Sequence, residues 1–397
     1  MLVISGTTIL EHVAHAQDGA PVAEAKPYRL NATYYSEFWR NVHGGQGTGF
    51  SYLDKLDLSA GADAGPLFGL DGLTVFTRAF YANGHGLSSR LTGDNQGVSS
   101  IEAARQFRIF ELWCEWRLSM NSSARFGLYD LNSEFDTLPT AAMFVNASQG
   151  IGRDVSQSGR MGPSIYPMSS LGVRSIWQVA PQWIAQAAIL DGVPGNPNHP
   201  TDTTVCISRK NGALLVGEAG YSNDVIHKIG LGAWHYISNF DTVGTGTYTT
   251  RSVPYSGNTG VYGLLDLTLA RVPGEIASKL DGFVRLGYAD PNVNRFGSFV
   301  GAGLVYSGFM KQDDRFGLGL AMARNGSPYL QAALLAGSPQ TAAETDIEAS
   351  WTIPVNPWLT LQPDLQYVIN PNTDSTIQND LVAGLRVTIS WDTSPGS

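Results

Sequence analysis

Four residues at alternate positions, Glu111, Trp113, Glu115 and Arg117, form the most unusual chemical pattern in this 397-residue chain. Alternate residues of a β-strand point to the same face of its sheet, so these side chains are predicted to share one polar face. Carboxylates and guanidinium groups pair with the hydroxyls of a neutral sugar, and an indole stacks on its C–H faces. We interpret this face as a candidate sugar-contacting surface; the alternative is that the charges only satisfy one another.

Two other strand-like segments place functional residues on a shared face. Glu37 and Trp39 alternate in the first such segment, and Asp281 and Arg285 lie four residues apart in a later one. Separations of two or four residues bring side chains to the same side of a strand. We add these four residues to the candidate surface, with mutual charge pairing again as the alternative.

The connection from residue 130 to residue 170 has no strand-like alternation and carries Glu134 and Asp136 near its start. Connections of this length inside a compact domain are uncommon and are usually functional. We predict that it folds inward and narrows a channel; the alternative is an external loop that shields a rim. The segment 83–106 is a second, shorter candidate.

The polar faces alternate with apolar ones, most clearly in the segment 380–391. Its length is close to the ~9–11 residues that a tilted strand needs to cross a bilayer. One face holds Leu381, Ala383, Leu385, Val387, Ile389 and Trp391, and the other holds Asp380, Gly384, Arg386, Thr388 and Ser390, with Val382 as the exception. Opposite Glu111, the predicted lipid face holds Phe110, Leu112, Cys114, Trp116 and Leu118. Recurrence of this pattern predicts a closed barrel with lipid outside and water inside.

The predicted fold class is all-β, a transmembrane antiparallel β-barrel of about 16 strands with an inward-folded constriction loop. Tight turns alternate with long connections, as at the two rims of outer-membrane barrels. Pro363 predicts a local irregularity, because proline cannot donate to a strand ladder. The predicted strands are 29–41, 50–61, 72–82, 107–119, 123–129, 171–180, 183–190, 213–221, 226–237, 259–268, 279–288, 297–307, 315–324, 342–352, 358–367 and 380–391.

Composition excludes several other classes. Charged residues make up 15% of the chain, below the ~25% of typical soluble domains, and no apolar run approaches the ~18 residues of a spanning helix. The net charge of -9 argues against a nucleic-acid partner. The seven histidines show no metal-ligand spacing, so neither a metal nor another cofactor is predicted. Cys114 and Cys206 match no redox spacing; a disulfide is possible, but inert residues are the better interpretation.

The termini are predicted to lie outside the barrel. Residues 1–16 end in Ala-His-Ala and are interpreted as the remnant of an export signal peptide. Residues 17–28 are predicted to be a disordered mature N-terminus, residues 29–391 the barrel domain, and residues 392–397 a short tail. Trp391 fits the terminal aromatic residue that the outer-membrane assembly machinery reads.

Several long motifs resemble the carbohydrate-selective porins of Gram-negative outer membranes, the OprB type, and they occur in order from about residue 29 to residue 391. They include Glu-Phe-Trp-Arg-Asn at 37–41, Tyr-Leu-Asp-Lys-Leu-Asp-Leu at 52–58, Phe-Glu-Leu-Trp at 110–113, Gly-Leu-Tyr-Asp-Leu-Asn-Ser-Glu-Phe-Asp at 127–136, Gln-Ser-Gly at 157–159, Gly-Pro-Ser-Ile at 162–165, Leu-Asp-Gly-Val-Pro-Gly at 190–195 and the segment 358–371. The resemblance implies a sixteen-stranded barrel in the outer membrane that passes glucose and related small neutral sugars by facilitated, passive diffusion. It also implies a constriction built from Glu37, Trp39, Glu111, Trp113 and the loop that carries Glu134 and Asp136.

Other functions stay open as alternatives. A polysaccharide-export channel or a general-diffusion channel would use similar lumen chemistry, and a barrel receptor without conductance is a third possibility. An enzyme is not predicted, because a retaining glycosidase needs two carboxylates ~5 Å apart. Glu111 and Glu115 on one strand would lie ~13 Å apart. The expected partners are small sugars, outer-membrane lipid and the assembly machinery, with a homotrimer possible.

Overall fold

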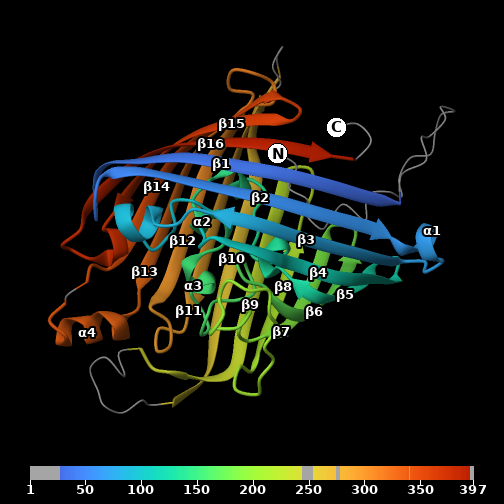
Figure 1. Cartoon of the computed structure of the whole chain (residues 1–397), viewed down its shortest axis with the longest axis horizontal. Coiled ribbons are helices and arrows are strands. Elements are labelled where there is room, and N and C mark those ends of the chain that lie inside the picture. Colours follow the sequence, from blue (N-terminus) through green and yellow to red (C-terminus); the bar gives the residue numbers. More distant parts are fainter. Residues whose placement is uncertain (1–26, 244–253, 274–277, 339, 394–397) are drawn as a thin grey trace.

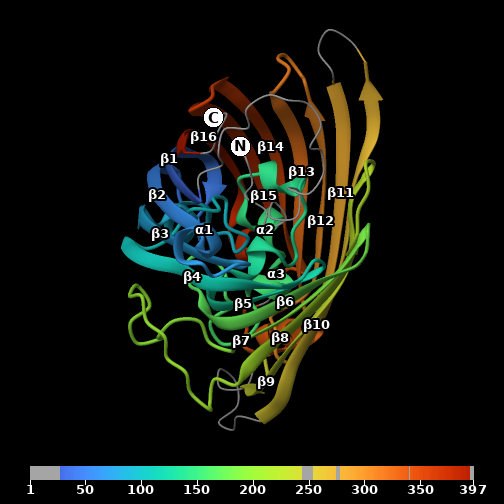
Figure 2. The ribbon, with the colours of Figure 1, turned by 90° about the vertical axis from the view of Figure 1, so that its right-hand side faces the viewer.

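Sixteen antiparallel strands close into one barrel, in which each strand pairs with its neighbours in the chain and β1 pairs with β16 (Figures 1 and 2). The computed structural model describes residues 27–243, 254–273, 278–338 and 340–393. The strands are β1 (Tyr28–Gly45), β2 (Gly49–Asp63), β3 (Leu73–Asn83), β4 (Gln106–Ser119), β5 (Ser122–Tyr129), β6 (Ser170–Ala180), β7 (Trp183–Asp191), β8 (Ala213–Tyr221), β9 (Ile226–Asp241), β10 (Pro254–Val272), β11 (Ser278–Ala289), β12 (Phe296–Ser307), β13 (Arg315–Asn325), β14 (Ala343–Asn356), β15 (Leu359–Ile369) and β16 (Gln378–Asp392).

The fold class and all sixteen strands predicted from the sequence are confirmed, with differences at the ends. β14 continues to Asn356, so the predicted connector 353–357 was wrong and the turn before β15 is only residues 357–358. Tyr28, predicted to be disordered, is the first residue of β1. The predictions for residues 1–16, for most of 17–28 and for the tail beyond residue 393 lie outside the described residues.

The two rims of the barrel differ in the length of their connections. One rim, the short-turn rim, holds connections such as 120–121, 181–182 and 222–225, together with the start of β1 and the end of β16. The other, the long-loop rim, holds the connections 84–105 and 130–169. Short turns face the periplasm and long loops the exterior in bacterial barrels, which orients the chain in the membrane.

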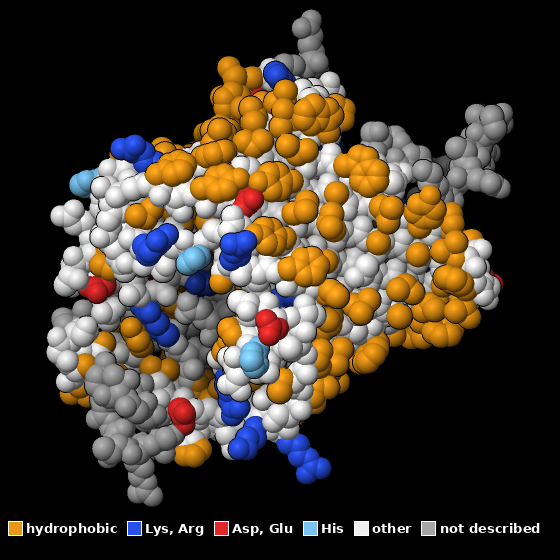
Figure 3. All heavy atoms as spheres, viewed as in Figure 1, with side chains coloured by type: hydrophobic (Ala, Val, Ile, Leu, Met, Phe, Trp, Pro, Cys, Tyr) orange, Lys and Arg blue, Asp and Glu red, His pale blue; other side chains and the backbone are white. Residues whose placement is uncertain are grey.

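Alternation along β16 separates a lipid-facing surface from the lumen as predicted. Ile389 and Trp391 are 43% and 57% exposed on the outer face, whereas Asp380 is fully buried inside. Val382, the exception in the pattern, is buried in the lumen in a cluster that contains Trp39. Apolar side chains dominate a broad part of the outer surface (Figure 3).

A β-bulge in β4 corrects one prediction made from strict alternation. Arg78 of β3 pairs with Glu111, but the next residue, Ala79, pairs with Ile109, so Phe110 is the extra residue. A bulge shifts the alternation by one position. Phe110, predicted to face lipid, is therefore 1% exposed inside the barrel, on the same side as Glu111. Cys114 keeps its predicted outward position, and both Cys114 and Cys206 are exposed free thiols.

Pro363 causes less disturbance than predicted. It lies opposite Leu385 of β16 with no register shift. On the β14 side the pairing is interrupted between Ser350–Asp364 and Ile353–Leu361 but resumes in the same register.

The connections from the long-loop rim form short helical segments inside the barrel: α2 (Ala147–Gly150) and α3 (Arg153–Ser156) lie within the ring of strands in Figure 2. The remaining long-loop-rim segments are α4 (Ser327–Leu335), the π-helical turn η3 (Ser88–Thr92) and the 3₁₀ turns η4 (Leu131–Ser133), η5 (Ala141–Met143) and η6 (Pro371–Thr373), whereas α1 (Ala64–Phe68) lies at the short-turn rim. None of the helices among the described residues is long and apolar enough to cross a membrane.

Candidate functional site

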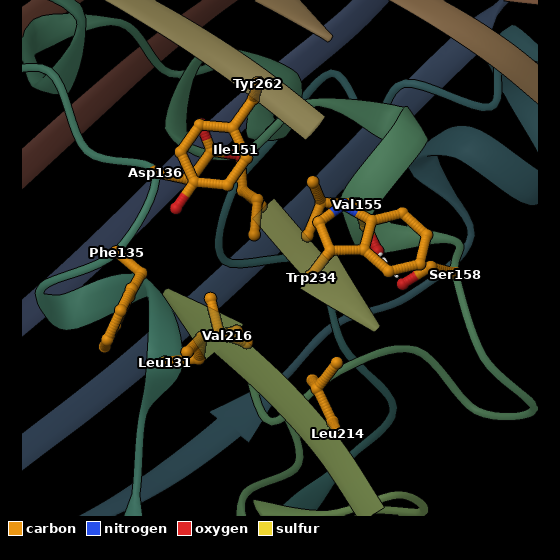
Figure 4. Close-up of a pocket in the computed structure, with 10 residues that line it drawn as sticks. All are labelled: Leu131, Phe135, Asp136, Ile151, Val155, Ser158, Leu214, Val216, Trp234 and Tyr262. Carbon is orange, nitrogen blue, oxygen red and sulfur yellow. Dashed lines mark hydrogen bonds between the residues drawn. The ribbon is translucent and has the colours of Figure 1, made fainter. Parts of the chain in front are cut away.

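The inward fold of the connection 130–169 is confirmed, and an apolar core holds one side of it against the barrel wall. Phe135, Phe144 and Val155 of this connection belong to one buried cluster with Trp234 of β9 and Phe283 of β11. Figure 4 shows part of this cluster around a cavity of about 10 Å³. That space suits about one water molecule, so no sugar fits in this cavity.

Arg285 of β11 bridges two carboxylates of the same connection. Its Nε and Nη2 donate to Asp136 at 2.9 and 2.7 Å, and Nη1 and Nη2 donate to Asp154 at 2.6 and 3.2 Å. A Cβ at Gly152 or Gly287 would collide with the guanidinium or with Asp154, so glycine is required for this close approach. Burial raises the pKa of Asp136 to about 6, and the Arg285 charge opposes that rise. Arg285 is thus a structural bridge between wall and loop, which we call the Arg285 bridge.

Carboxylates on the barrel wall also accept hydrogen bonds from the backbone of the inward connections. Glu218 of β8 accepts from Asp136 N at 2.9 Å, and Asp266 of β10 accepts from Thr140 N at 2.7 Å. On the far side of the lumen, Glu348 of β14 accepts from Val145 N at 2.6 Å. A buried backbone N–H needs an acceptor, so these inward acids fix the path of the loop.

The connection 84–105 is held in the same way. Glu344 of β14 accepts from Asn95 N at 2.9 Å and from Gln96 N at 2.8 Å. Glu37 accepts from Ser99 Oγ at 2.6 Å, and also from Trp39 Nε1 at 2.6 Å. Residues 95–99 of the second candidate loop therefore also lie inside the barrel.

Glu37 and Trp39 share the predicted lumen face, but neither is accessible. Both are fully buried, and Arg386 of β16 donates to Glu37 Oε1 at 2.5 Å, across the seam that closes the barrel. The indole packs in a cluster with Leu53 and Val98. In this structure the pair supports the connection 84–105.

Glu115 and Glu134 meet in a second charge cluster with two arginines of the neighbouring strands. Arg125 of β5 lies 2.7 Å from Glu115, and Arg174 of β6 lies 2.5 Å from Glu134 and 3.1 Å from Glu115. Trp113 stacks on Phe76 with ring centroids 4.8 Å apart. The guanidinium of Arg125 lies 3.7 Å from the Trp113 centroid. Only 8% of Trp113 is exposed, so stacking on a sugar would require some of these contacts to give way.

A third cluster surrounds Arg78 of β3, which sequence reasoning missed. Arg78 lies 3.1 Å from Asp57 and 3.7 Å from Glu111, and 30% of its side chain is exposed. Lys55 lies 2.7 Å from Asp57 on β2. Burial and the neighbouring Glu111 raise the pKa of Asp130, at the start of the loop, to about 7. The alternation of Lys55 and Asp57 was the signal that could have revealed this cluster.

The last two predicted residues lie towards the short-turn rim. Asp281 accepts from Thr268 Oγ1 at 2.7 Å and lies 2.7 Å from Nζ of Lys279, whose side chain is 43% exposed. Arg117 is exposed near the end of β4.

The ten predicted residues therefore occupy several clusters rather than one ring. Glu37, Glu115, Glu134, Asp136 and Arg285 all form ion pairs, and a sugar contact by any of the ten residues stays a prediction. No group of three or more potential ligands suited to a metal ion occurs in the part of the chain that the structure describes.

A closed barrel with an apolar exterior, a charged lumen and inward connections has the architecture of a porin. The chain belongs to the carbohydrate-selective porins of the OprB family, whose family model matches residues 47–391. It is accordingly an integral protein of the bacterial outer membrane, in a family and fold of channels rather than enzymes.

Individual proteins are also similar to this chain. The curated Porin B of Pseudomonas aeruginosa is 23% identical, over 91% of this chain and 87% of that protein. The high-pH structure of Pseudomonas putida OprB superposes with a TM-score of 0.81 at 21% identity, covering 92% of this chain and 94% of that one. The outer-membrane channel DcaP of Acinetobacter baumannii gives a TM-score of 0.57 at 10% identity, covering 92% and 97% of the two chains.

Proposed function

We propose that this porin passes glucose and related small neutral sugars across the outer membrane by facilitated, passive diffusion. The observation that carries the proposal is a lumen narrowed by two inward connections, beside which hydroxyl-pairing groups stay partly accessible. The exposed side-chain fractions are 30% for Arg78, 12% for Glu115 and 43% for Lys279.

The predicted site residues divide into two roles under this proposal. The accessible ones, Glu115 and Arg117, contact the sugar together with Arg78 and Lys279, and the buried Asp281 orients Lys279. The buried ones set the width of the aperture by holding the loops or by orienting the arginines; they are Glu37, Trp39, Glu111, Trp113, Glu134, Asp136 and Arg285.

The mechanism follows from solvation at the constriction. A sugar that enters loses part of its hydration, and paired carboxylate and guanidinium groups offset the loss because they offer both acceptors and donors to each hydroxyl. Binding has to stay weak, since a site that holds its solute tightly conducts poorly. No energy source enters this scheme, so the sugar gradient sets the direction.

A catalytic role is not proposed. The wall carboxylates Glu218, Asp266, Glu344 and Glu348 accept backbone N–H groups, and Glu37, Glu115 and Asp136 are paired with arginines. Because these acids are held in hydrogen bonds and ion pairs, we propose a structural role for them rather than proton transfer. We also propose that the outer-membrane assembly machinery is a partner of this chain. A homotrimer stays a prediction, to be tested by native mass spectrometry.

Liposome swelling with the refolded chain tests the function. The solutes are glucose, a disaccharide, an uncharged amino acid and a sugar acid matched to glucose in size. Faster entry of glucose than of the matched solutes supports the proposal. Entry ordered by size alone would make the protein a general-diffusion channel, and ready entry of oligosaccharides would favour polysaccharide export. No entry through a folded barrel would favour a receptor.

A matched pair of variants tests the site. Arg78→Gln is expected to lower the preference for glucose by roughly tenfold at most, the equivalent of one hydrogen bond of ~1.4 kcal/mol. Arg209→Gln changes an exposed arginine in the connection 192–212 and should leave the preference unchanged. If both variants show the same preference for glucose, Arg78 does not contact the sugar.

A further inference from the structure

A group of cationic side chains lies at the long-loop rim of the face that β1–β3 form, on β1 and on the connection 84–105. Arg40 and His43 lie on the outward side of β1, opposite Ala383 and Leu381 of β16. The connection 84–105 adds exposed residues of the same kind, and we call the whole set the basic rim patch: Arg40, His43, His85, Arg90 and Arg105. Figure 3 shows Lys, Arg and His side chains gathered on the left of this face, beyond the broad apolar area.

Strand pairing and loop contacts bring the patch together. Arg40 is opposite Phe50 of β2, and the β1–β2 turn donates two backbone hydrogen bonds to Leu91 O, the residue after Arg90, at 2.8 and 3.0 Å. Arg105 donates to the hydroxyl of Tyr81 on β3 at 3.1 Å. The three arginines therefore lie on adjacent elements at the long-loop rim.

No carboxylate among the described residues neutralises these three arginines. Arg40, Arg90 and Arg105 form none of the ion pairs found in that part of the chain. Arg90 Nη2 donates only to the backbone oxygen of His85, at 3.1 Å. The acid of the same connection, Glu102, accepts the backbone N–H groups of Gly86 and Ser88 instead.

The surface around the cations is apolar and aromatic. Phe50 and Phe107 are 64% and 62% exposed, and Phe38 is 43% exposed. These rings lie on the outward faces of β2, β4 and β1, within the lipid-facing wall. A ligand that fits this face has an anionic, hydrogen-bonding head and several acyl chains. Arginine suits phosphate in particular, because its planar guanidinium binds two oxygens at once.

We propose that the basic rim patch binds a lipid with a phosphorylated sugar headgroup in the outer leaflet. The phosphates pair with Arg40, Arg90 and Arg105, and the acyl chains pack on Phe50 and Phe107. The long-loop rim faces the exterior, so the patch meets the leaflet in which such a glycolipid lies. Each arginine near an anionic lipid surface contributes ~1 kcal/mol, or about fivefold in affinity.

The experiment measures binding of lipid A carrying two phosphates to the refolded barrel in detergent, by native mass spectrometry and by fluorescence titration. The test variant is Arg40→Ser/Arg90→Ser/Arg105→Ser. A charge-preserving variant replaces the same three residues by lysine. The matched control is Arg209→Ser/Lys210→Ser, which removes two exposed cations from the connection 192–212. Heat-modifiable gel mobility and glucose-driven swelling confirm that every variant is folded and open.

The expected result is roughly hundredfold weaker binding by the serine variant, the product of three fivefold losses. The lysine variant should keep most of the affinity and the control all of it. Lipid A without phosphates should bind weakly, and excess inorganic phosphate should compete little, since it lacks the acyl contacts.

Three outcomes would overturn the proposal. The first is equal affinity of the serine variant and the unmodified protein. The second is equal binding of lipid A with and without phosphates. The third is a stable oligomer whose cross-links run through Arg40 or Arg105, because a second copy would then occupy this face.

Discussion

Removal of the Arg285 bridge should widen the channel, because the bridge holds the connection 130–169 against the wall. Arg285→Met keeps the length of the side chain but deletes four hydrogen bonds to Asp136 and Asp154. The side chains of all three residues are at most 5% exposed. Breaking a buried ion pair from one side costs ~3–5 kcal/mol, since it leaves unpaired charge in a dry site.

That cost acts on the docked position of the loop rather than on the barrel as a whole. The sixteen-stranded ladder does not depend on Arg285 side-chain contacts, whereas Asp136 and Asp154 can regain water only if the loop moves away. A loss of ~3–5 kcal/mol changes a docking equilibrium by about two to nearly four powers of ten. We expect higher single-channel conductance, faster entry of a disaccharide and faster proteolysis within residues 130–169.

Two further variants sharpen the test. Arg271→Met removes an exposed cation of β10 that donates to the backbone oxygen of Asp224 at 2.7 Å; it has no assigned contact with the connection 130–169 or with the sugar, so the disaccharide cut-off should not change. Adding Asp136→Asn and Asp154→Asn to Arg285→Met removes the unpaired charges and should restore part of the narrow channel.

The acidity of Asp136 gives an independent check. Burial holds its pKa at about 6 even beside Arg285, and loss of the guanidinium raises the pKa further. Lowering the pH from 8 to 5 should therefore protonate the Asp136 carboxyl in Arg285→Met. The conductance of this variant should then move back towards that of the unmodified protein. Unchanged conductance, cut-off and proteolysis in Arg285→Met would refute the structural role assigned to the bridge.

Three other substitutions have defined outcomes. Asp130 has a pKa of about 7 in the folded protein against ~3.9 when unfolded, so its ionisation destabilises the fold as the pH rises between those values. Asp130→Asn should therefore raise the free energy of unfolding at pH 8 and leave it unchanged below about pH 4. Equal gains in denaturant titrations at both pH values would contradict this. Trp113→Ala should lower sugar selectivity more than total conductance and cost ~3–5 kcal/mol of stability. Trp113→Phe, which can keep a ring beside Arg125, should preserve selectivity in swelling assays. Equal loss of selectivity in both variants would exclude the packing role. Glu344→Ala leaves the backbone N–H groups of Asn95 and Gln96 without their acceptor, at ~1–3 kcal/mol each, and should expose the connection 84–105 to protease. Unchanged cleavage would show that Glu344 is not its anchor.

The sequence by itself determined the barrel, because alternation is a local property. Each strand shows its lipid face through its own period-two pattern, so sixteen strands and two kinds of rim were readable without knowledge of neighbours. The length and composition of the connection 130–169 also indicated an inward loop. Glu37 and Glu111 could be assigned to the lumen because they alternate with outward residues.

Tertiary structure decided what those lumen residues do. The bulge at Phe110 reverses the alternation, and only the register with β3 reveals it. The apolar lumen core around Phe144 and Phe283 breaks the rule that barrel interiors are polar, because a packed loop replaces water there. The partner of Asp136 is Arg285, 149 residues away. Such pairings depend on which distant strands and loops the closed sheet brings together. No local pattern in the sequence shows which of these residues will meet.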